Sequence, residues 1–484
     1  MEVSVRDFAA HRAGELIAMS SIFSGLSIAQ RSLSAQQLGL EITQRNVANA
    51  NTPGYSKLRV NFEPAIASDV VTAQPGMGVA EATIESFRNN FIDFRISQEL
   101  QGQGEQQAAF DALQQVEALF NDPDGQGIQS AMSDFFASFS ALANTPESLS
   151  LRQQVIQRAT ALTEVFHQLY NRVKELQLQQ DRIVSDTVQD INSISADVAR
   201  LNAEIAVAHG TQANDESALR DERQRLLSKL SELMDISYYE DSRGMVTVAA
   251  KQGPVLVVGD ITKPLELGTS PVTGLNTITQ GGTDVTTFIQ SGKLGGVLKV
   301  RDTILPEYLN SLDDLAAGLI QRVNAQHALG VDLNGVAGGN IFVPFVQPVP
   351  GSNTGAARGM AVSITDPETI AAAGPAAGPG SNANANLLAG IQNETFASLG
   401  TTPGQFYANL VYRIGSDGAS AHDSLQTKQN LVQQLENQRD AFSGVNLDEE
   451  AVNIIRYQKA YQASARFVTV IDNLTSDLLR ILGG

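Results

Sequence analysis

Apolar residues recur at helical spacing near both ends of the chain. Near the start, residues separated by three, four or seven positions form one seam: Ile22, Leu26, Ala29, Leu33, Leu40 and Val47. Near the end, residues separated alternately by four and three positions form another: Phe467, Ile471, Leu474, Leu478 and Ile481. Such spacing predicts amphipathic helices. Because Gln36 and Thr43 interrupt the first seam, and both segments are rich in Ser, Gln and Ala, each helix needs a partner to be stable in water.

The centre of the chain predicts a much longer helix over residues 147–209. Its apolar seam has a first run of Val155, Ala159, Leu162, Phe166, Leu169, Val173 and Leu176, and a second run of Val184, Val188, Ile191, Ile194, Val198, Leu201 and Ile205. Asn144 or Thr145 can cap its start, and His209-Gly210 suits its end. At 1.5 Å per residue, about 60 residues make a rod of roughly 90 Å. Shorter amphipathic segments lie at 110–120, 128–142 and 219–233.

After Asp235 the pattern changes to short apolar runs separated by turns. Ser242-Arg243-Gly244 predicts a hairpin connection, so we expect a small β domain over 237–290. A helix is expected over 305–328, and Gly, Pro, Ala and Asn dominate 331–420, where 371–385 reads as a loop or linker. Helix returns near Asp423 and continues, with one break at Ser443-Gly444, to the end. The predicted fold is mainly α, with β structure inserted between helical ends.

Composition narrows the functional classes. Asp and Glu number 52 and Lys and Arg 33, so the formal charge is −19, which disfavours binding to nucleic acid or to anionic lipid. Cysteine is absent, which removes disulfides, thiolate metal sites and cysteine nucleophiles. No run of about 18 apolar residues could form a membrane-spanning helix.

The sequence contains no convincing catalytic constellation. H-E-x-x-H, G-x-S-x-G and the P-loop motif are missing, and the five histidines are widely scattered. Asp221-Glu222-Arg223 lies on a predicted helix beside leucines, where we expect a solvated face with local ion pairs. We therefore expect no enzyme activity, no cofactor and no metal site.

Two short strings are more specific than the helical periodicity. The first, NVANANTPGYS at 46–56, reads as a helix end whose asparagines satisfy free carbonyls, followed by a Pro-Gly turn. The second, SGVNLDEE at 443–450, reads as a helix start in which Asn446 or Asp448 caps and the acidic residues favour the helix dipole. An ordinary capped helix would not require the pair Tyr457 and Tyr461 that follows.

Together these strings resemble the signatures of bacterial flagellar axial proteins, the rod, hook and hook-associated subunits. Two interior stretches, LRDERQRLLSKLSELMDISYY at 219–239 and the segment 289–342 with its GVDLNG element at 330–335, are similar to the subunits that join hook to filament. The resemblance implies that the terminal helices pair in a coiled-coil-like inner domain, with other domains radiating outward. It also implies a structural role at that junction, which filament assembly requires.

The resemblance sets the expected domain divisions. They are 19–60 for the N-terminal inner segment, 61–236 for a helical rod, 237–290 for the β domain, 291–342 for a helix returning to the rod, 343–420 for an outer or loop region, and 421–484 for the C-terminal helices. Residues 1–18 precede Met19-Ser20-Ser21-Ile22-Phe23, which looks like the family's own beginning. We therefore expect this leader to be absent from the working protein.

The resemblance also assigns the assembly contacts. They fall on the N-terminal seam and turn at Ile22, Leu26, Leu33, Leu40, Val47, Asn49, Asn51, Pro53, Gly54 and Tyr55. They fall also on C-terminal residues Leu447, Tyr457, Tyr461, Phe467, Ile471, Leu474, Leu478 and Ile481. The implied partners are further copies in a ring or helical lattice, the hook protein, a second junction protein (hook-associated protein 3) and an export chaperone at the C-terminal helix. The implied location is extracellular, after export by the flagellar secretion apparatus without a cleaved signal.

Other functions are also compatible with parts of the sequence. A hook or rod subunit would share the two strings but should lack the 147–209 rod, and a flagellin would have helical ends without the strings. A wall hydrolase on the same scaffold would need a paired-carboxylate or metal site in 237–420, where none is visible. An adhesive coiled-coil surface protein is the alternative outside the family.

Overall fold

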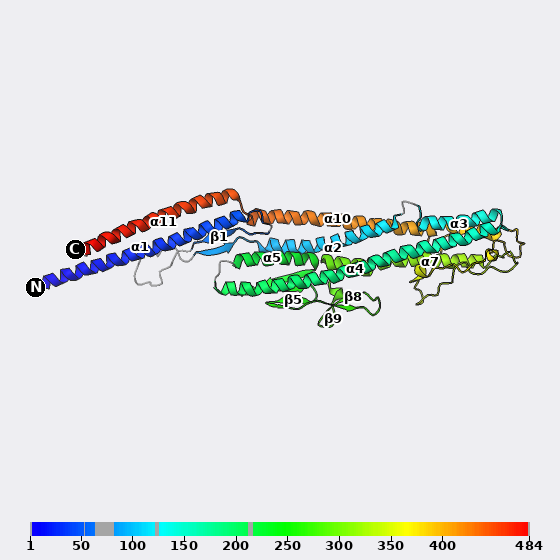
Figure 1. Ribbon diagram of the computed structural model, residues 1–484, viewed down its shortest axis with the longest axis horizontal. Coiled ribbons are helices and arrows are strands. Elements are labelled where there is room, and N and C mark those ends of the chain that lie inside the picture. Colours follow the sequence, from blue (N-terminus) through cyan, green and yellow to red (C-terminus); the bar gives the residue numbers. More distant parts are fainter. Residues whose placement is uncertain (1, 53, 63–81, 122–124, 212–215, 483–484) are drawn as a thin grey trace.

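The computed structural model describes residues 2–52, 54–62, 82–121, 125–211 and 216–482. Within these ranges the side chains of residues 2–21, 210, 211, 478, 479, 481 and 482 are not described. The molecule is elongated (Figure 1). At one end, α1 (Glu2–Ala48) and α11 (Leu447–Leu482) lie side by side, and we call this pair the inner coil. The predicted pairing of the two end helices is confirmed.

The remaining helices form what we call the body. Its long helices are α2 (Asn90–Phe120), α3 (Ile128–Asn144), α4 (Leu149–Thr211), α5 (Glu216–Leu233), α7 (Leu305–His327) and α10 (Pro403–Ser443). The shorter helices are α6 (Gly292–Lys299), α8 (Ala356–Gly359) and α9 (Ala383–Gly390). Far from the inner coil, α2, α3, α4, α7 and α10 enclose an apolar core that contains Phe135, Phe139 and Phe166, each fully buried.

The long central helix follows its predicted seam closely. α4 has 63 residues, hence a length of about 95 Å, and every residue of the predicted seam is buried except Ile194, which is partly buried. Its predicted cap is wrong. Asn144 ends α3 and Thr145 follows it, whereas the Ser148 hydroxyl accepts the Leu151 N–H at 3.4 Å at the start of α4. Asn144 to Pro146 therefore serve the turn between the two helices.

The β structure lies on one side of the body, against α4 and α5. β3 (Ile236–Glu240), β4 (Val246–Ala250), β5 (Val255–Val258) and β6 (Ile261–Thr262) form one antiparallel sheet, and β7 (Glu266–Thr269), β8 (Asn276–Gln280) and β9 (Thr283–Asp284) form another. The predicted turn at 242–244 joins β3 to β4. There the Asp241 carboxylate accepts the N–H groups of Arg243 and Met245, both at 2.9 Å, and Gly244 has φ +80°.

Two predictions in the C-terminal half need correction. α10 begins at Pro403, twenty residues before Asp423, because Thr402 caps it by accepting the Gln405 N–H at 3.2 Å and proline suits the first turn. The segment 371–385 is not simply a linker. Its first three alanines, together with Ile370, are almost completely buried in the body, and α9 begins at Ala383.

A short hairpin connects the inner coil to the body. β1 (Leu58–Asn61) and β2 (Thr83–Ser86) pair antiparallel, and Leu58 and Val60 pack with Ile42 of α1 in a small apolar cluster. β2 leads directly into α2, and α10 ends where α11 begins. We call this region, where both chain crossings between inner coil and body occur, the joint.

Candidate assembly site

Both specific strings line a single cleft at the joint. The cleft has a volume of 990 Å³, and its walls include Thr52, Gly54 and Tyr55 from the first string and Asn446 and Glu450 from the second. The strings are almost four hundred residues apart in sequence, and the fold brings them together.

The end of α1 is built by asparagine side chains, as predicted. The Asn49 amide donates to the Arg45 carbonyl at 2.9 Å, which satisfies a free acceptor at the helix end. Asn46 does more. Its side chain donates to the Leu58 carbonyl at 2.9 Å and accepts the Leu58 N–H at 3.0 Å, so it pairs with β1 as a strand would. The Tyr55 hydroxyl donates to the same Asn46 oxygen at 2.9 Å.

The turn after α1 needs a glycine. Gly54 has φ +79°, a conformation that side chains disfavour, while the Tyr55 N–H bonds the Thr52 carbonyl at 3.2 Å. Asn51 is exposed, and Pro53 lies outside the described residues. Burial, and secondarily the charge of Asp221, raise the pKa of Tyr55 to about 12, so its hydroxyl stays protonated and keeps donating at neutral pH.

The start of α11 is capped by Asn446, one of the two predicted candidates. Its side chain accepts the N–H groups of Asp448 at 3.0 Å and Glu449 at 3.4 Å. Lys57 from the turn binds this helix start, with its ammonium 2.5 Å from Glu449 and 3.8 Å from the buried Glu450. The Lys57 N–H also donates to the Ser443 carbonyl at 2.9 Å, so the backbone ties the turn to the end of α10 and the side chain ties it to the start of α11.

Small residues, rather than the predicted apolar seam, mediate the antiparallel pairing of α1 with α11. A Cβ on Gly39 would lie 2.9 Å from the Tyr457 ring, and one on Gly25 would lie 3.2 Å from Ile471. Between these points the hydroxyls of Ser32 and Ser464 are 2.9 Å apart. Glycine and serine let the two backbones approach closely, so the helices pair with little apolar burial.

The predicted seam residues therefore divide into two groups. Ile471 and Tyr457 are buried against α1, and Ile22, Leu33 and Leu40 are partly buried. The exposed members are Leu26, Val47, Leu447, Tyr461, Phe467 and Leu474. The side chains of Leu478 and Ile481 lie outside the described residues. Tyr457, Ser464 and Ile471, spaced seven residues apart, occupy the face of α11 that contacts α1. The assembly role predicted for the exposed residues stays a prediction.

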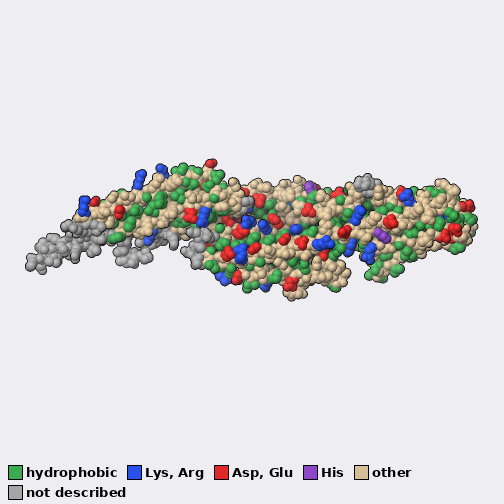
Figure 2. Space-filling view, in the orientation of Figure 1, with side chains coloured by type: hydrophobic (Ala, Val, Ile, Leu, Met, Phe, Trp, Pro, Cys, Tyr) green, Lys and Arg blue, Asp and Glu red, His purple; other side chains and the backbone are tan. Residues whose placement is uncertain are grey.

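A second face of α11 carries an exposed apolar stripe. Val452, Phe467, Val470 and Leu474 are 64%, 49%, 51% and 52% exposed, and their spacing places them on one side of the helix. We call these four residues the outer stripe. The space-filling view shows apolar surface along this part of the inner coil (Figure 2). Large side chains exposed in a row mark a contact surface.

A buried ion cluster lies on the body side of the joint. Arg88 contacts Asp221 of α5, and its Nε is 3.4 Å from Asp93 of α2. The Asp221 carboxylate also accepts the Ser56 N–H, at 3.5 Å, from the last residue of the first string. Burial raises the pKa of Asp221 to about 6 and raises that of Asp93, although Arg88 opposes both shifts.

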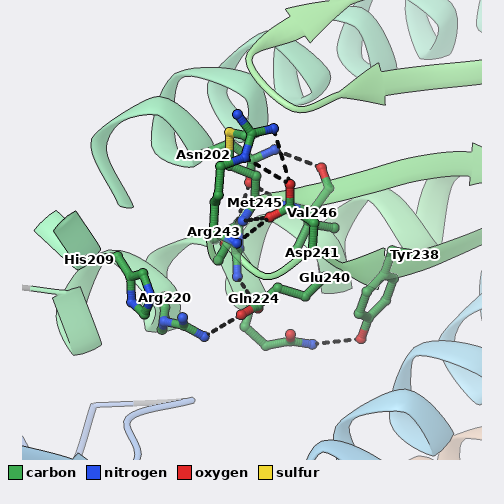
Figure 3. Close-up of polar contacts among 12 residues, drawn as sticks. Asn202, His209, Arg220, Gln224, Tyr238, Glu240, Asp241, Arg243, Met245 and Val246 are labelled. Carbon is green, nitrogen blue, oxygen red and sulfur yellow. Dashed lines mark hydrogen bonds and ion pairs between the residues drawn. The ribbon is translucent and has the colours of Figure 1, made fainter. Parts of the chain in front are cut away.

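The expected solvated face at 221–223 is wrong for two of its three residues. Arg223 is 4% exposed and donates to Glu240 at 2.7 Å, to the Gly244 carbonyl at 2.5 Å and to Asn202 at 3.0 Å. Figure 3 shows the surroundings, in which Asn202 bonds both backbone groups of Val246 and Arg220 reaches Glu240 at 2.6 Å. Only Glu222 faces solvent, in an ion pair with Arg225. α5 thus holds the β3–β4 hairpin against α4.

The raised pKa of Asp221 predicts a pH dependence of stability. Asp221 binds a proton more tightly in the folded chain than in the unfolded chain, so its contribution to the free energy of unfolding increases as pH falls from about 6 toward 3.8. Between pH 7.5 and 5 this amounts to about 1.4 kcal/mol.

Urea unfolding of the wild type and Asp221→Asn at both pH values measures this contribution. The stability of the wild type relative to the variant should increase on acidification. The buried His327, whose pKa burial lowers, acts in the opposite direction but is common to both proteins and cancels. An unchanged difference between the two proteins would contradict the assignment.

Two further features of the described residues concern metal binding and membrane spanning. No group of three or more His, Cys, Asp or Glu in the described ranges could hold a metal ion. Among those same residues, no helix is long and apolar enough to cross a membrane. The arrangement joins helices and presents an apolar stripe, which suits contacts between protein subunits.

Three family models match three separate parts of the chain. Residues 113–342 match the flagellar hook-associated protein FlgK helical domain. Residues 26–55 match the flagella basal body rod protein model, and residues 436–481 match the flagellar basal body rod FlgEFG protein C-terminal model. The two shorter matches contain residues 46–55 of the first string and the whole of the second string.

Relatives match over nearly the whole chain. Flagellar hook-associated protein 1 of Bacillus subtilis is 30% identical over 511 residues, which cover 96% of this chain and 99% of the relative. The protein of the same name from Salmonella typhimurium is 24% identical over 564 residues, covering 96% and 100%. Among solved structures, the flagellar hook junction protein FlgK from Burkholderia pseudomallei has a similar fold, with a TM-score of 0.63, 17% identity, and coverage of 72% of this chain and 100% of that chain.

Proposed function

The chain belongs to the family of flagellar hook-associated protein 1, and we propose that it is the structural subunit that forms the junction between hook and filament. The observation that carries the proposal is the cleft, in which both axial-protein strings meet at the base of the inner coil. The body supplies the second argument, since the hook-associated helical domain model covers 113–342. A hook or rod subunit shares the strings but lacks that body.

We propose that copies associate in a ring or helical lattice through the inner coil. The outer stripe supports this, because its four apolar side chains are about half exposed or more in the single chain. Contacts between different surfaces of identical subunits close a ring or continue as a helix. The assembly residues predicted from the sequence lie along α1, along α11 and at the joint, and Leu447 and Tyr461 among them are exposed.

The more specific partners are part of the same proposal. One side of the ring would bind the hook protein, the other side hook-associated protein 3, and an export chaperone would bind α11 before assembly. Export would use the flagellar secretion apparatus without a cleaved signal. The exposed apolar side chains of α11 support a chaperone there, because an unassembled outer stripe favours aggregation.

Deletion of the gene tests the function directly. The deletion strain should form hooks of normal length and no filaments, and expression of the chain should restore filaments. A tagged copy should appear at a single position on each flagellum, between hook and filament. Filaments on the deletion strain would refute the junction role, and loss of the hooks would indicate a hook or rod subunit instead.

Gly39→Ala should reduce filament number without altering the body. The added methyl group would lie 2.9 Å from the Tyr457 ring and push α1 and α11 apart, and such overpacking costs about 1–3 kcal/mol. Gly415→Ala is the matched control, because this helical glycine of α10 has no neighbour within 4 Å of an added Cβ. The urea midpoint of the body and the filament count per cell measure the two effects. Equal filament counts in both variants would contradict the close pairing at Gly39.

A further inference from the structure

One arginine stands at the centre of the joint. Arg88 lies between β2 and α2, with a side chain that is only 16% exposed. Its guanidinium contacts Asp221 through one nitrogen, approaches Asp93 through Nε, and donates to the Arg220 carbonyl at 3.5 Å through another. A planar guanidinium can serve three acceptors in different directions, which a lysine ammonium on the same site would do less well.

Asp221 carries the contact from Arg88 to the first string. Its second carboxylate oxygen accepts the Ser56 N–H, and Ser56 is 5% exposed. Ser56 directly precedes Lys57, which binds Glu449 at the start of α11. A continuous series of polar contacts therefore runs from α2 through α5 to the turn of the inner coil.

α5 is a rigid support for Asp221. The preceding residue Arg220 binds Glu240 at 2.6 Å, and Arg223 binds Glu240, Asn202 and the β3–β4 turn (Figure 3). These contacts fix α5 to the sheet and to α4. Asp221 is thereby presented to the turn from a part of the body that cannot easily rotate.

The charges around Asp221 explain why the arginine is needed. Asp93 on α2 interacts unfavourably with the ionised Asp221 carboxylate, and Arg88 is the cation that contacts both. Arg439 of α10 faces Asp93 from the other side. Without Arg88, two buried carboxylates would face each other, and burial of unpaired charges is costly.

Further charges approach the turn from the inner coil. Arg45 of α1 and Glu450 of α11 act on Tyr55 in opposite directions. The Arg88 guanidinium is in direct contact with the Asp221 carboxylate and therefore holds it ionised and in place.

We propose that Arg88 is a positioning residue for assembly: it orients Asp221 so that the first string, and with it the inner coil, is held at one angle to the body. The proposal rests on the function proposed above, because the angle decides whether neighbouring inner coils can contact one another. Whether the turn holds a fixed position relative to the body can be measured on the purified chain, without any flagellum.

The absence of cysteine in the native chain makes that measurement simple. Spin labels at Thr52→Cys on the turn and Gln114→Cys on α2 report the turn's position relative to the body, and both native residues are exposed. In the doubly labelled protein that keeps Arg88, we expect double electron–electron resonance to give a narrow distribution of label-to-label distances. Arg88→Ala should widen that distribution at least twofold at pH 8.

The pH profile separates positioning from a general loss of structure. In Arg88→Ala, both Asp93 and Asp221 can protonate at pH 5, which removes their repulsion, so the distribution should narrow again. A merely structural defect would not reverse with pH. Arg88→Lys should give an intermediate width, because it keeps the charge but not the three directions of contact.

Arg158→Ala is the matched control, since it removes an exposed arginine whose partner Asp134 lies 2.9 Å away on α3. It should leave the width unchanged at every pH. An Arg88→Ala distribution as narrow as the control at pH 8 would overturn the proposal. If Arg88→Ala does not fold, Asp221→Ala, which removes the acceptor for Ser56, must widen the distribution in its place or the proposal fails.

Filament counts in cells then distinguish the assembly role of Arg88 from the junction function of the whole protein. Arg88→Ala cells should carry at least tenfold fewer filaments than Arg158→Ala cells. A widened distribution with normal filaments would overturn the assembly role of Arg88 while leaving the junction function intact. Filaments on the deletion strain would refute the junction function itself.

Discussion

Leu474→Asp should abolish filament growth while leaving the body of the protein as stable as before. Leu474 is 52% exposed in the single chain, so a carboxylate there remains in water and costs the monomer little. In the proposed lattice the same position is covered by a neighbouring copy. Burying an unpaired carboxylate there costs several kcal/mol, and each 1.4 kcal/mol weakens a contact tenfold.

Repetition around the lattice amplifies this effect, because every subunit pays the same cost at each equivalent contact. The measurement is the number and length of filaments on cells that express the variant in place of the wild type. Ser476→Asp is the matched control, since it adds the same charge two residues away, at an exposed polar position on another face of α11. Filaments of wild-type length with Leu474→Asp would show that the outer stripe is not a contact surface.

The apolar periodicity predicted the buried face of α4 better than the buried faces of α1 and α11, and packing explains the difference. The seam of α4 contains large apolar residues such as Val155, Phe166 and Val188 in two runs, and two apolar clusters of the body bury them. In α11 two apolar faces lie side by side. The more apolar face, with Phe467 and Leu474, is the more evident in the sequence. The less apolar face, with Tyr457 and Ile471, is the one that packs against α1.

That choice follows from the partner helix. α1 presents Gly25, Ser32 and Gly39 at the contact, and a small-residue face pairs best with few, well-spaced side chains. A single sequence does not show which of two helices will meet which face. The larger apolar face remains exposed, as the proposed contact between copies requires.

The cleft could be anticipated only in part. The asparagines and the Pro-Gly turn of 46–56 indicate a helix end, and the Asn446 cap of α11 was among the two candidates named. The sequence does not predict the joint, because Arg88, Asp221 and Ser56 are far apart along the chain and residues of these types usually lie on the surface. Asp221 and Arg223 within one charged stretch gave no sign that both would be buried.

Hydrogen exchange on the purified monomer should show the inner coil opening far more readily than the body. Residues 150–205 of α4 bury a continuous seam, and their amides should remain protected for hours. α1 and α11 meet through glycine, serine and a few apolar side chains such as Ile471, which offset little of the roughly 1–2 kcal/mol of backbone entropy lost per ordered residue.

Peptides covering residues 26–47 and 467–481 should therefore exchange within seconds to minutes, at least a hundredfold faster than α4, because local opening there requires only the loss of small contacts. In assembled flagella each inner coil gains neighbours on its outer stripe, so the same peptides should become as protected as α4. The comparison of monomer with assembled flagella is its own control, since sequence and intrinsic exchange rates are identical. Protection of the end peptides at the level of α4 in a proven monomer would refute the view that assembly completes the folding of this part of the chain.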